Sequence, residues 1–306
     1  MSPAESVLRD AGFTGEARMS EPMSRHTSLR IGGPAEVMAY PEGVEELSRL
    51  LAAARKSGVP VFILGRGTNL LVLDGGIPGL TVNMKKLSWM DIERSGGGPA
   101  QVHAGAGASL TKLVSYCADA GLSGIEFAAG IPGTVGGAVA MNAGAGEGEI
   151  KDVLTSVTLV DGDGTVTKLP ASALNMTYRR GGLPEGSTVV EASMALIPWP
   201  AEEVKERVAA NIRRRRATQP IKVMSAGSTF RNPPGYSAWK LIDMAGLRGK
   251  TVGGAAVCTA HTNFLINTGN ATARDFRALM DLVVNTVRER LNIELVPEVR
   301  IVGVEL

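Results

Sequence analysis

Hydrophobic and polar residues in the first eighty positions switch between the spacings of strands and helices. Residues 35–40 and 61–64 form short apolar runs, and between them apolar residues recur every three or four positions over 44–54. This pattern predicts a strand, a helix and a second strand that leads directly into Gly65-Arg66-Gly67-Thr68-Asn69. Another strand is predicted over 79–84, whereas the residues before the first strand are interpreted as a polar leader.

The middle of the chain contains a predicted hairpin. Residues 154–160 and 165–169 read as alternating strands that flank Asp161-Gly162-Asp163-Gly164, a composition typical of a tight turn. The turn also resembles the start of a calcium loop, but the later glutamate of such a loop is missing at the required spacing. Upstream, the pattern predicts a strand over 101–104 and a helix after Ser109, whose side chain is expected to cap it.

The last third of the chain contains two predicted helices. A strand over 188–197 ends at Pro198-Trp199-Pro200, where two prolines favour a linker between domains. The next helix keeps its apolar positions over 204–212 on one face and ends in four arginines, 213–216, which suit the helix carbonyl end. A longer helix over 272–291 opens with a capping-box pair, Thr272 and Asp275.

Composition narrows the class of protein. The 306 residues are 44% hydrophobic and 20% charged, which is enough to bury a core and form two or three domains. A net charge of +2 gives no overall field for nucleic acid or an anionic membrane, so neither is expected as a partner. Cys117 and Cys258 lack metal-ligand spacing and are expected to be reduced thiols, and no metal site is predicted. No apolar run approaches the ~18 residues of a membrane span, which favours a cytoplasmic location.

Glycine is the informative excess, with 38 residues that gather in clusters. The segment 65–69 lacks the third glycine of the dinucleotide fingerprint and the Gly-Lys-Ser/Thr ending of a phosphate loop. Two glycines followed by Thr68 and Asn69 at the end of a strand nevertheless suit a phosphate group. A plain strand-ending turn explains this segment equally well.

The second glycine-rich segment runs from Gly130 to Gly146 and has six glycines in seventeen positions. So many glycines would cost a helix or a strand heavily in conformational entropy. Small residues with a few hydroxyl and amide groups are what a backbone needs to wrap closely around a flat, polar cofactor. The alternative is a tight crossing within a sheet.

Together the two segments resemble those of the UDP-N-acetylenolpyruvoylglucosamine reductases of bacterial peptidoglycan synthesis, a flavoprotein family with the vanillyl-alcohol oxidase type of fold. The resemblance extends over nearly the whole chain. Besides 65–72 and 126–145, it includes His26-Thr27-Ser28-Leu29-Arg30-Ile31-Gly32-Gly33, Tyr178-Arg179, Ala226-Gly227-Ser228-Thr229-Phe230-Arg231-Asn232-Pro233 and Pro297-Glu298-Val299-Arg300.

The resemblance implies an α+β fold and a noncovalently bound FAD. Two α/β flavin subdomains, 1–85 and 86–199, would precede an α/β substrate domain, 200–298, and 299–306 is expected to return to the first subdomain. The residues expected to contact FAD are Gly65, Arg66, Gly67, Thr68, Asn69, Leu70, Gly130, Ile131, Pro132, Gly133, Thr134, Gly136, Gly137 and Ala138.

The implied enzyme is a UDP-N-acetylmuramate dehydrogenase, in which NADPH reduces FAD and flavin N5 passes hydride to the enolpyruvyl ether of UDP-N-acetylglucosamine. The developing charge requires a cation at the substrate carboxylate and a proton donor at the neighbouring carbon. Arg179 corresponds to the family's arginine at the carboxylate, Ser228 to its proton donor, and Glu298 to the glutamate that assists the enol form. Each residue has an alternative interpretation. Arg179 could be an ordinary surface arginine, Ser228 could belong to a simple turn, and Glu298 could form an ion pair with Arg300.

Tyr178, Arg216 and Asn232 are expected to contact the sugar nucleotide, although most of the arginines 213–216 read as a solvated helix end. His261 is interpreted as a hydrogen-bonded structural histidine at least as readily as a residue that lines the site. The connection between Arg179 and Thr188 has no room for the inserted tyrosine loop of some family members, so the chain resembles the shorter subtype. A monomer is expected.

Two other classes compete with this hypothesis. An oxygen-using alcohol or sugar oxidase could share the flavin domain, but such oxidases often tether flavin through a histidine in the loop equivalent to 65–69, which has none here. A catalytically inactive flavin-binding module is the second alternative. The joint presence of Arg179, Ser228 and Glu298 argues against it.

Overall fold

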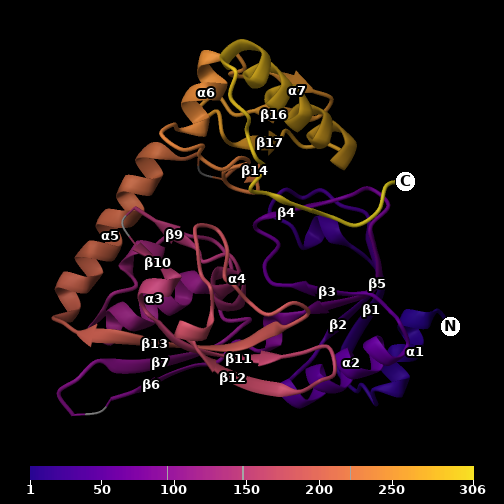
Figure 1. Ribbon diagram of the computed structural model, residues 1–306, viewed down its shortest axis with the longest axis vertical. Coiled ribbons are helices and arrows are strands. Elements are labelled where there is room, and N and C mark those ends of the chain that lie inside the picture. The colour runs from indigo at the N-terminus through magenta and orange to yellow at the C-terminus, as the bar shows by residue number, and fades with distance from the viewer. Residues whose placement is uncertain (95, 147, 221) are drawn as a thin grey trace. The chain divides into compact units, whose positions relative to one another are not determined.

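The computed structural model of the chain describes residues 1–94, 96–146, 148–220 and 222–306 (Figure 1). It divides into two compact units, each with its own apolar core. Unit 1 comprises Met1–Arg18, Val37–Arg66 and Gly79–Arg215, and unit 2 comprises Met19–Glu36, Gly67–Pro78 and Arg216–Leu306.

The first sheet has the strand order β1-β2-β5-β3, formed by Glu16–Pro22, Pro34–Tyr40, Ile77–Asn83 and Val61–Leu64. Strands β3 and β5 run parallel. Helix α2 (Val44–Lys56) connects β2 to β3, as the apolar spacing predicts, and buries Leu47 and Leu50. Helix α1 (Pro3–Asp10) lies in the segment interpreted as a polar leader, and a capping box of Ser2 and Glu5 starts it.

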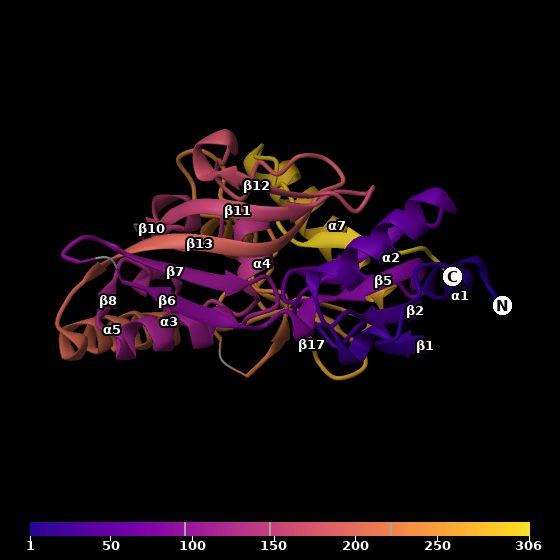
Figure 2. The ribbon, with the colours of Figure 1, turned by 90° about the horizontal axis from the view of Figure 1, so that it is seen from below.

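The largest sheet of unit 1 has the order β12-β11-β13-β7-β6, which Figure 2 shows side by side. These strands are Val166–Pro170, Leu154–Val160, Thr188–Pro198, Ala100–Gly105 and Met90–Glu93, and β8 (Leu122–Ser123) also pairs with β13. The hairpin of β11 and β12 is confirmed, because Gly164 N donates to Asp161 O (3.0 Å) in the turn. The other elements that follow β7 in this unit are α3 (Leu110–Asp119), α4 (Val135–Ala140), β9 (Gly144–Ala145), β10 (Gly148–Glu149) and most of α5 (Ala201–Thr218).

Unit 2 is built around the antiparallel sheet β14-β17-β16-β15, formed by Met224–Ser225, Leu265–Asn267, Ala255–Val257 and Thr251–Val252. Helix α7 (Ala273–Leu291) begins at the expected capping box of Thr272 and Asp275 and packs its apolar face into the core with α6 (Ala238–Met244). Near the chain end, β18 (Arg300–Val302) pairs in parallel with β4 (Leu70–Val72) (Figure 1). One short 3-10 helix, Met23–Arg25, lies in unit 2, and four lie in unit 1, at Met84–Lys86, Glu126–Ala128, Ile150–Asp152 and Ala171–Ala173.

Two local expectations were wrong. Ser109 directly precedes α3, but its side chain makes no capping hydrogen bond there, and its backbone forms a bridge with Thr134 instead. The glycine-rich segment also contains the short helix α4, despite the entropic cost of glycine in a helix. Glycine is required at this place because a Cβ at Gly136 would lie only 2.8 Å from the Cβ of Ala106.

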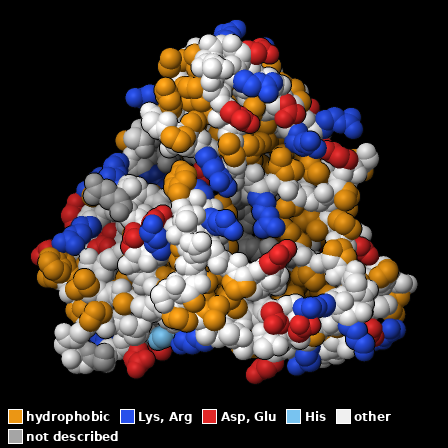
Figure 3. Space-filling model, viewed as in Figure 1, with side chains coloured by type: hydrophobic (Ala, Val, Ile, Leu, Met, Phe, Trp, Pro, Cys, Tyr) orange, Lys and Arg blue, Asp and Glu red, His pale blue; other side chains and the backbone are white. Residues whose placement is uncertain are grey.

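Acidic and basic side chains lie next to one another over α6 and α7 on the face that Figure 3 shows. Of the helices in the described part of the chain, none combines the length and the apolar character that a membrane crossing requires. Among the residues that the structure describes, no group of three or more His, Cys, Asp or Glu side chains could hold a metal ion.

Candidate active site

The two glycine-rich segments meet in unit 1. Strand β3 ends at Leu64, and a Cβ added to the next residue, Gly65, would lie 2.7 Å from Thr134 Oγ1. That oxygen is fixed, because it accepts a hydrogen bond from Gly137 N (3.3 Å) at the start of α4. Segments that are 69 positions apart in the sequence therefore lie against each other, and a side chain at position 65 would have to displace Thr134.

The second segment is attached firmly to the sheet of unit 1. Val135 N and Gly136 N each donate a 2.9 Å hydrogen bond, to Ala108 O and Ala106 O respectively, in the connection that follows β7. Gly137 on the same helix turn is exposed. A glycine-lined surface that is rigid underneath and accessible above has the form that a close-fitting planar cofactor requires. The predicted contact residues Gly130, Ile131, Pro132, Gly133, Thr134, Gly136, Gly137 and Ala138 all lie in unit 1.

The first segment divides between the units. Gly65 and the exposed Arg66 belong to unit 1, and Gly67, Thr68, Asn69 and Leu70 belong to unit 2. Gly67 has a φ of +60°, and a side chain there would collide with the carbonyl oxygen of His26. Glycine is thus required at position 67 by both its backbone conformation and its neighbour.

Arg179 lies in unit 1 on a turn between Thr177 and Arg180. Its Nη1 donates to Gly144 O of the second glycine-rich segment (3.4 Å), and its guanidinium stacks over the Tyr178 ring, 4.9 Å from the centroid. The guanidinium of Arg179 is therefore held against the segment predicted to bind the cofactor, which is not the environment of an ordinary surface arginine.

Arg215 is not among the predicted site residues, yet it lies against the second glycine-rich segment. A Cβ added to Gly130 would lie 3.1 Å from Arg215 Cδ, so this side chain packs on the second glycine-rich segment. Burial, and secondly the positive charge of Arg179, lower the pKa of Arg215 below its ordinary value. Helical spacing predicts that Arg215 shares a face of α5 with Ile212, three residues earlier, but it does not show what that face packs against. Arg216, the predicted substrate contact, is exposed.

The segments that contain Ser228 and Glu298 pair with each other in unit 2, although the two residues are 70 positions apart in the sequence. Glu298 N donates a 2.8 Å hydrogen bond to the carbonyl oxygen of Thr229, the residue after Ser228. Thr229 is buried and donates its own N–H to Asn263 O (2.8 Å), which fixes this strand-like stretch from the other side. Both Ser228 and Glu298 remain half-buried and thus partly accessible.

Asn69, in the first glycine-rich segment, lies beside Glu298. Its Nδ2 donates to the carbonyl oxygen of Glu298 (3.1 Å), while Arg300 N donates to the carbonyl oxygen of Asn69 (3.0 Å). A residue predicted to contact the cofactor therefore lies beside Glu298, one of the residues predicted to act in catalysis. This arrangement was not visible in the spacing of the sequence.

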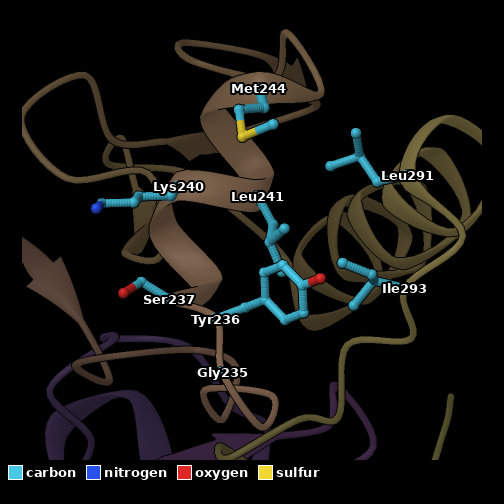
Figure 4. Close-up of a pocket in the computed structure, with 8 residues that line it drawn as sticks. All are labelled: Gly235, Tyr236, Ser237, Lys240, Leu241, Met244, Leu291 and Ile293. Carbon is cyan, nitrogen blue, oxygen red and sulfur yellow. The ribbon is translucent and has the colours of Figure 1, made fainter.

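Asn232 begins the segment that leads into α6. Its Oδ1 accepts a hydrogen bond from Ala238 N (2.9 Å), which leaves the side-chain amide as donor. A neighbouring pocket of about 350 Å³ is lined mainly by apolar side chains of α6 and the end of α7. Figure 4 shows Tyr236 and Leu241 facing Ile293, whereas Lys240 points away. The predicted site residues do not line this pocket.

His261 packs against Phe264, with ring centroids 4.9 Å apart, and more loosely against Trp239. Burial lowers its pKa below the ordinary value of 6.5, and the charge of Arg248 adds to this effect. A neutral histidine in an aromatic environment fits a structural role. The expected hydrogen bond is not seen at Nδ1, which is buried without a hydrogen-bond partner among the described residues.

Comparison with known proteins agrees with this geometry. Residues 35–170 match the family of FAD-binding domains, and residues 219–302 match the C-terminal domain of UDP-N-acetylenolpyruvoylglucosamine reductase. The UDP-N-acetylenolpyruvoylglucosamine reductase of Moorella thermoacetica is 44% identical over 292 residues, 95% of both chains. The corresponding reductase of Acidiphilium cryptum is 47% identical over 289 residues, which cover 94% of this chain and 92% of the relative.

A solved structure of the same family is also similar to this chain. The reductase of the same name from Thermus caldophilus superposes with a TM-score of 0.80 at 37% identity, covering 94% of this chain and 98% of that structure. A variant of berberine bridge enzyme shares the fold alone, with a TM-score of 0.51 and 17% identity over 64% of this chain and 44% of that one.

Fold and site define an FAD-binding oxidoreductase with the vanillyl-alcohol oxidase type of fold, followed by a C-terminal domain of the reductase family. The glycine surface formed by Gly65 and the second segment fits a closely approaching flavin. The chain belongs to the family of UDP-N-acetylenolpyruvoylglucosamine reductases, flavoproteins of peptidoglycan synthesis.

Proposed function

We propose that the protein reduces the enolpyruvyl ether of UDP-N-acetylglucosamine to UDP-N-acetylmuramate, with NADPH as the source of reducing equivalents. The observation that supports this proposal is the hydrogen bond from Glu298 N to the carbonyl oxygen of Thr229, the residue that follows Ser228. The carboxyl group of Glu298 and the hydroxyl group of Ser228, on paired segments, suit protonation of a carbon next to a carboxylate. Family membership at 44% identity over 95% of the chain supports the same substrate class.

Three residues would divide the chemistry. FAD, when bound, would supply hydride from N5 to the terminal carbon of the enolpyruvyl double bond. Ser228 would donate its hydroxyl proton to the adjacent carbon, a role that a weak acid can fill only where water is excluded. Arg179 would hold the carboxylate with its planar guanidinium and so stabilise the charge that develops there. Glu298 would assist the enol form of the intermediate.

The remaining residues would bind the two ligands. FAD would be held noncovalently, because 65–69 contains no histidine to tether it. Tyr178, which stacks on Arg179, would contact the substrate together with Arg216 and Asn232, whose side-chain amide suits a pyrimidine base or a phosphate. The division into 1–85, 86–199 and 200–298 stays a prediction, as does the monomeric state. A cytoplasmic location would keep the buried, unpaired Cys117 and Cys258 reduced.

The test is an anaerobic half-reaction experiment on the purified protein. Its flavin absorbance should be bleached by NADPH and restored when UDP-N-acetylglucosamine enolpyruvate is added. Denaturation should release the flavin into the supernatant, as expected for a noncovalent cofactor. Reoxidation by oxygen alone, without any response to the sugar nucleotide, would refute the proposed activity.

Ser228→Ala tests the proton donor. We expect the variant to bind FAD and to be reduced by NADPH normally, but to be reoxidised by the sugar nucleotide at least about 100-fold more slowly, the scale of general acid catalysis. Ser225→Ala is the matched control, since Ser225 is also a half-buried serine of unit 2 and lies three residues upstream. Equal rates for the two variants would exclude Ser228 as the donor.

A further inference from the structure

Asn142 is a buried residue of the second glycine-rich segment to which the proposed mechanism gives no role. It lies just after α4, its exposed fraction is 0%, and its φ is +42°. Residues other than glycine rarely adopt this left-handed conformation, although asparagine tolerates it better than most. A buried polar residue in an uncommon conformation requires strong local interactions.

The side chain of Asn142 makes three hydrogen bonds within unit 1. Its Nδ2 donates to the carbonyl oxygen of Thr177 (3.1 Å) and to Glu149 Oε2 (2.9 Å). Its Oδ1 accepts a hydrogen bond from Lys151 N (3.0 Å). Both N–H groups and the oxygen of the amide are therefore used, and the residue connects three separate parts of the chain.

One of these contacts holds the turn that carries Arg179. Thr177 and Arg180 exchange two backbone hydrogen bonds, of 2.9 and 3.0 Å, and the carbonyl oxygen of Thr177 accepts both the Arg180 N–H and the Asn142 amide. Arg179 itself has a φ of +59°, which costs free energy and persists only where the surroundings enforce it. Gly181 N, just beyond the turn, donates to Ala140 O at the end of α4 (2.9 Å).

We propose that Asn142 is a positioning residue for Arg179: its amide fixes the turn between Thr177 and Arg180, so that the guanidinium is presented to the substrate carboxylate in one orientation. This inference rests on the proposed function of Arg179. Asn142 acts through the turn and contacts neither substrate nor the reacting atoms. Displacement of a carboxylate-binding guanidinium by about 1 Å is enough to slow a reaction by about 100-fold.

Asn142→Asp is the informative variant. Aspartate has the same shape and tolerates the left-handed backbone, but it has no N–H to donate and would place a carboxylate against Thr177 O and Glu149. Hydrogen exchange of the peptide that contains Thr177 and Arg180 measures the turn directly. We expect the exchange of these two amides to become at least about tenfold faster, because the hydrogen bond from Asn142 to Thr177 O no longer opposes opening of the turn.

Kinetics then connect the turn to the reaction. FAD content and reduction by NADPH should stay within about twofold of the parent protein, whereas reoxidation by the enolpyruvyl sugar nucleotide should slow by about 10- to 100-fold. In an Arg179→Ala background, Asn142→Asp should add less than about a twofold effect, because residues that act as one unit are not additive. A merely structural defect would instead slow both half-reactions.

Asn292→Asp serves as the matched control. Asn292 also has a left-handed backbone, with a φ of +53°, but it is exposed at the end of α7 in unit 2. If Asn142→Asp fails to fold, Asn142→Gly keeps the left-handed conformation, removes the three side-chain bonds and is held to the same criteria.

The possible outcomes separate the two hypotheses. Unchanged exchange at Thr177 and Arg180, or effects of Asn142→Asp and Arg179→Ala that multiply, would overturn the positioning role. Normal reoxidation in Arg179→Ala alone would refute the proposed role of Arg179, and hydrogen exchange would then decide by itself whether Asn142 fixes the turn.

Discussion

Gly65 faces Thr134 across the candidate cofactor surface, and a Cβ on the glycine would come within 2.7 Å of the threonine hydroxyl. The hydroxyl cannot easily move away, since it accepts the hydrogen bond from Gly137 N that starts α4. The relationship explains why the end of β3 is followed by glycine. It also brings the two glycine-rich segments into contact, so that a substitution in one segment should alter the conformation of the other.

Gly65→Ala should therefore weaken FAD binding. The added methyl group must displace Thr134 and strain the start of α4, at a cost of about 1–3 kcal/mol for overpacking. The ratio of flavin to protein absorbance after purification and dilution measures the loss. Gly98→Ala is the control in the same unit, because a Cβ at Gly98 would meet nothing within 4 Å. Full flavin occupancy in Gly65→Ala would show that the two segments do not form a shared surface.

Arg215→Met should raise the KM for the sugar nucleotide by about tenfold, the loss expected for one hydrogen bond to a charged group. The positive charge of Arg179 lowers the pKa of Arg215, so the two guanidinium groups repel each other. An anionic ligand bound near both groups would relieve that repulsion, and the proposed substrate is an anion. Reduction by NADPH should be unaffected. Arg213→Met, on an exposed part of the same helix, should leave KM unchanged. An equal KM for both variants would remove Arg215 from the binding surface.

Glu46→Gln should destabilise the protein at neutral pH and make little difference in acid. Burial by itself raises the pKa of Glu46, but amide hydrogen bonds from Glu42, Thr14 and Gly15 outweigh burial and lower the pKa below 4.5. A carboxylate with a lowered pKa stabilises the fold above its unfolded-state pKa, and this contribution is lost as the pH falls through the folded-state value. Urea unfolding at pH 7 should show a loss of about 1–2 kcal/mol that shrinks toward pH 3.

The control for this prediction is Glu45→Gln on the same helix turn, where the side chain is exposed. We expect it to change the free energy of unfolding by no more than about 0.5 kcal/mol at either pH. A loss in Glu46→Gln that is as large at pH 3 as at pH 7 would contradict the assignment of the effect to the ionised carboxylate.

Cys117 should resist thiol reagents in the native protein. Burial, with a smaller effect of Glu126, raises the pKa of its thiol to about 12, so roughly one molecule in ten thousand carries the reactive thiolate at pH 8. In a Cys258→Ser background, iodoacetamide at pH 8 should label the protein only after unfolding in urea, which mass spectrometry would measure. Rapid labelling of the folded protein would mean that this part of the core opens readily.

Much of the local structure follows from the sequence because local interactions determine it. The apolar spacing correctly predicted helix α2 and strands β3 and β11, since burying one face of an element requires that spacing. The capping box of Thr272 and Asp275 likewise marked the start of α7. A capping box of Ser2 and Glu5 also starts α1, but the segment around it is polar and offers few apolar positions from which a helix could be predicted.

The glycine clusters also made a cofactor predictable, and the ordered motifs placed the chain in its family. The sequence could not show which residues meet, because contacts between distant segments depend on packing that no local pattern encodes. Only the tertiary structure placed Gly65 against Thr134 and Glu298 beside Thr229. It also decided that Arg215 packs on the glycine segment, since the helix face that turns inward is set by what it packs against.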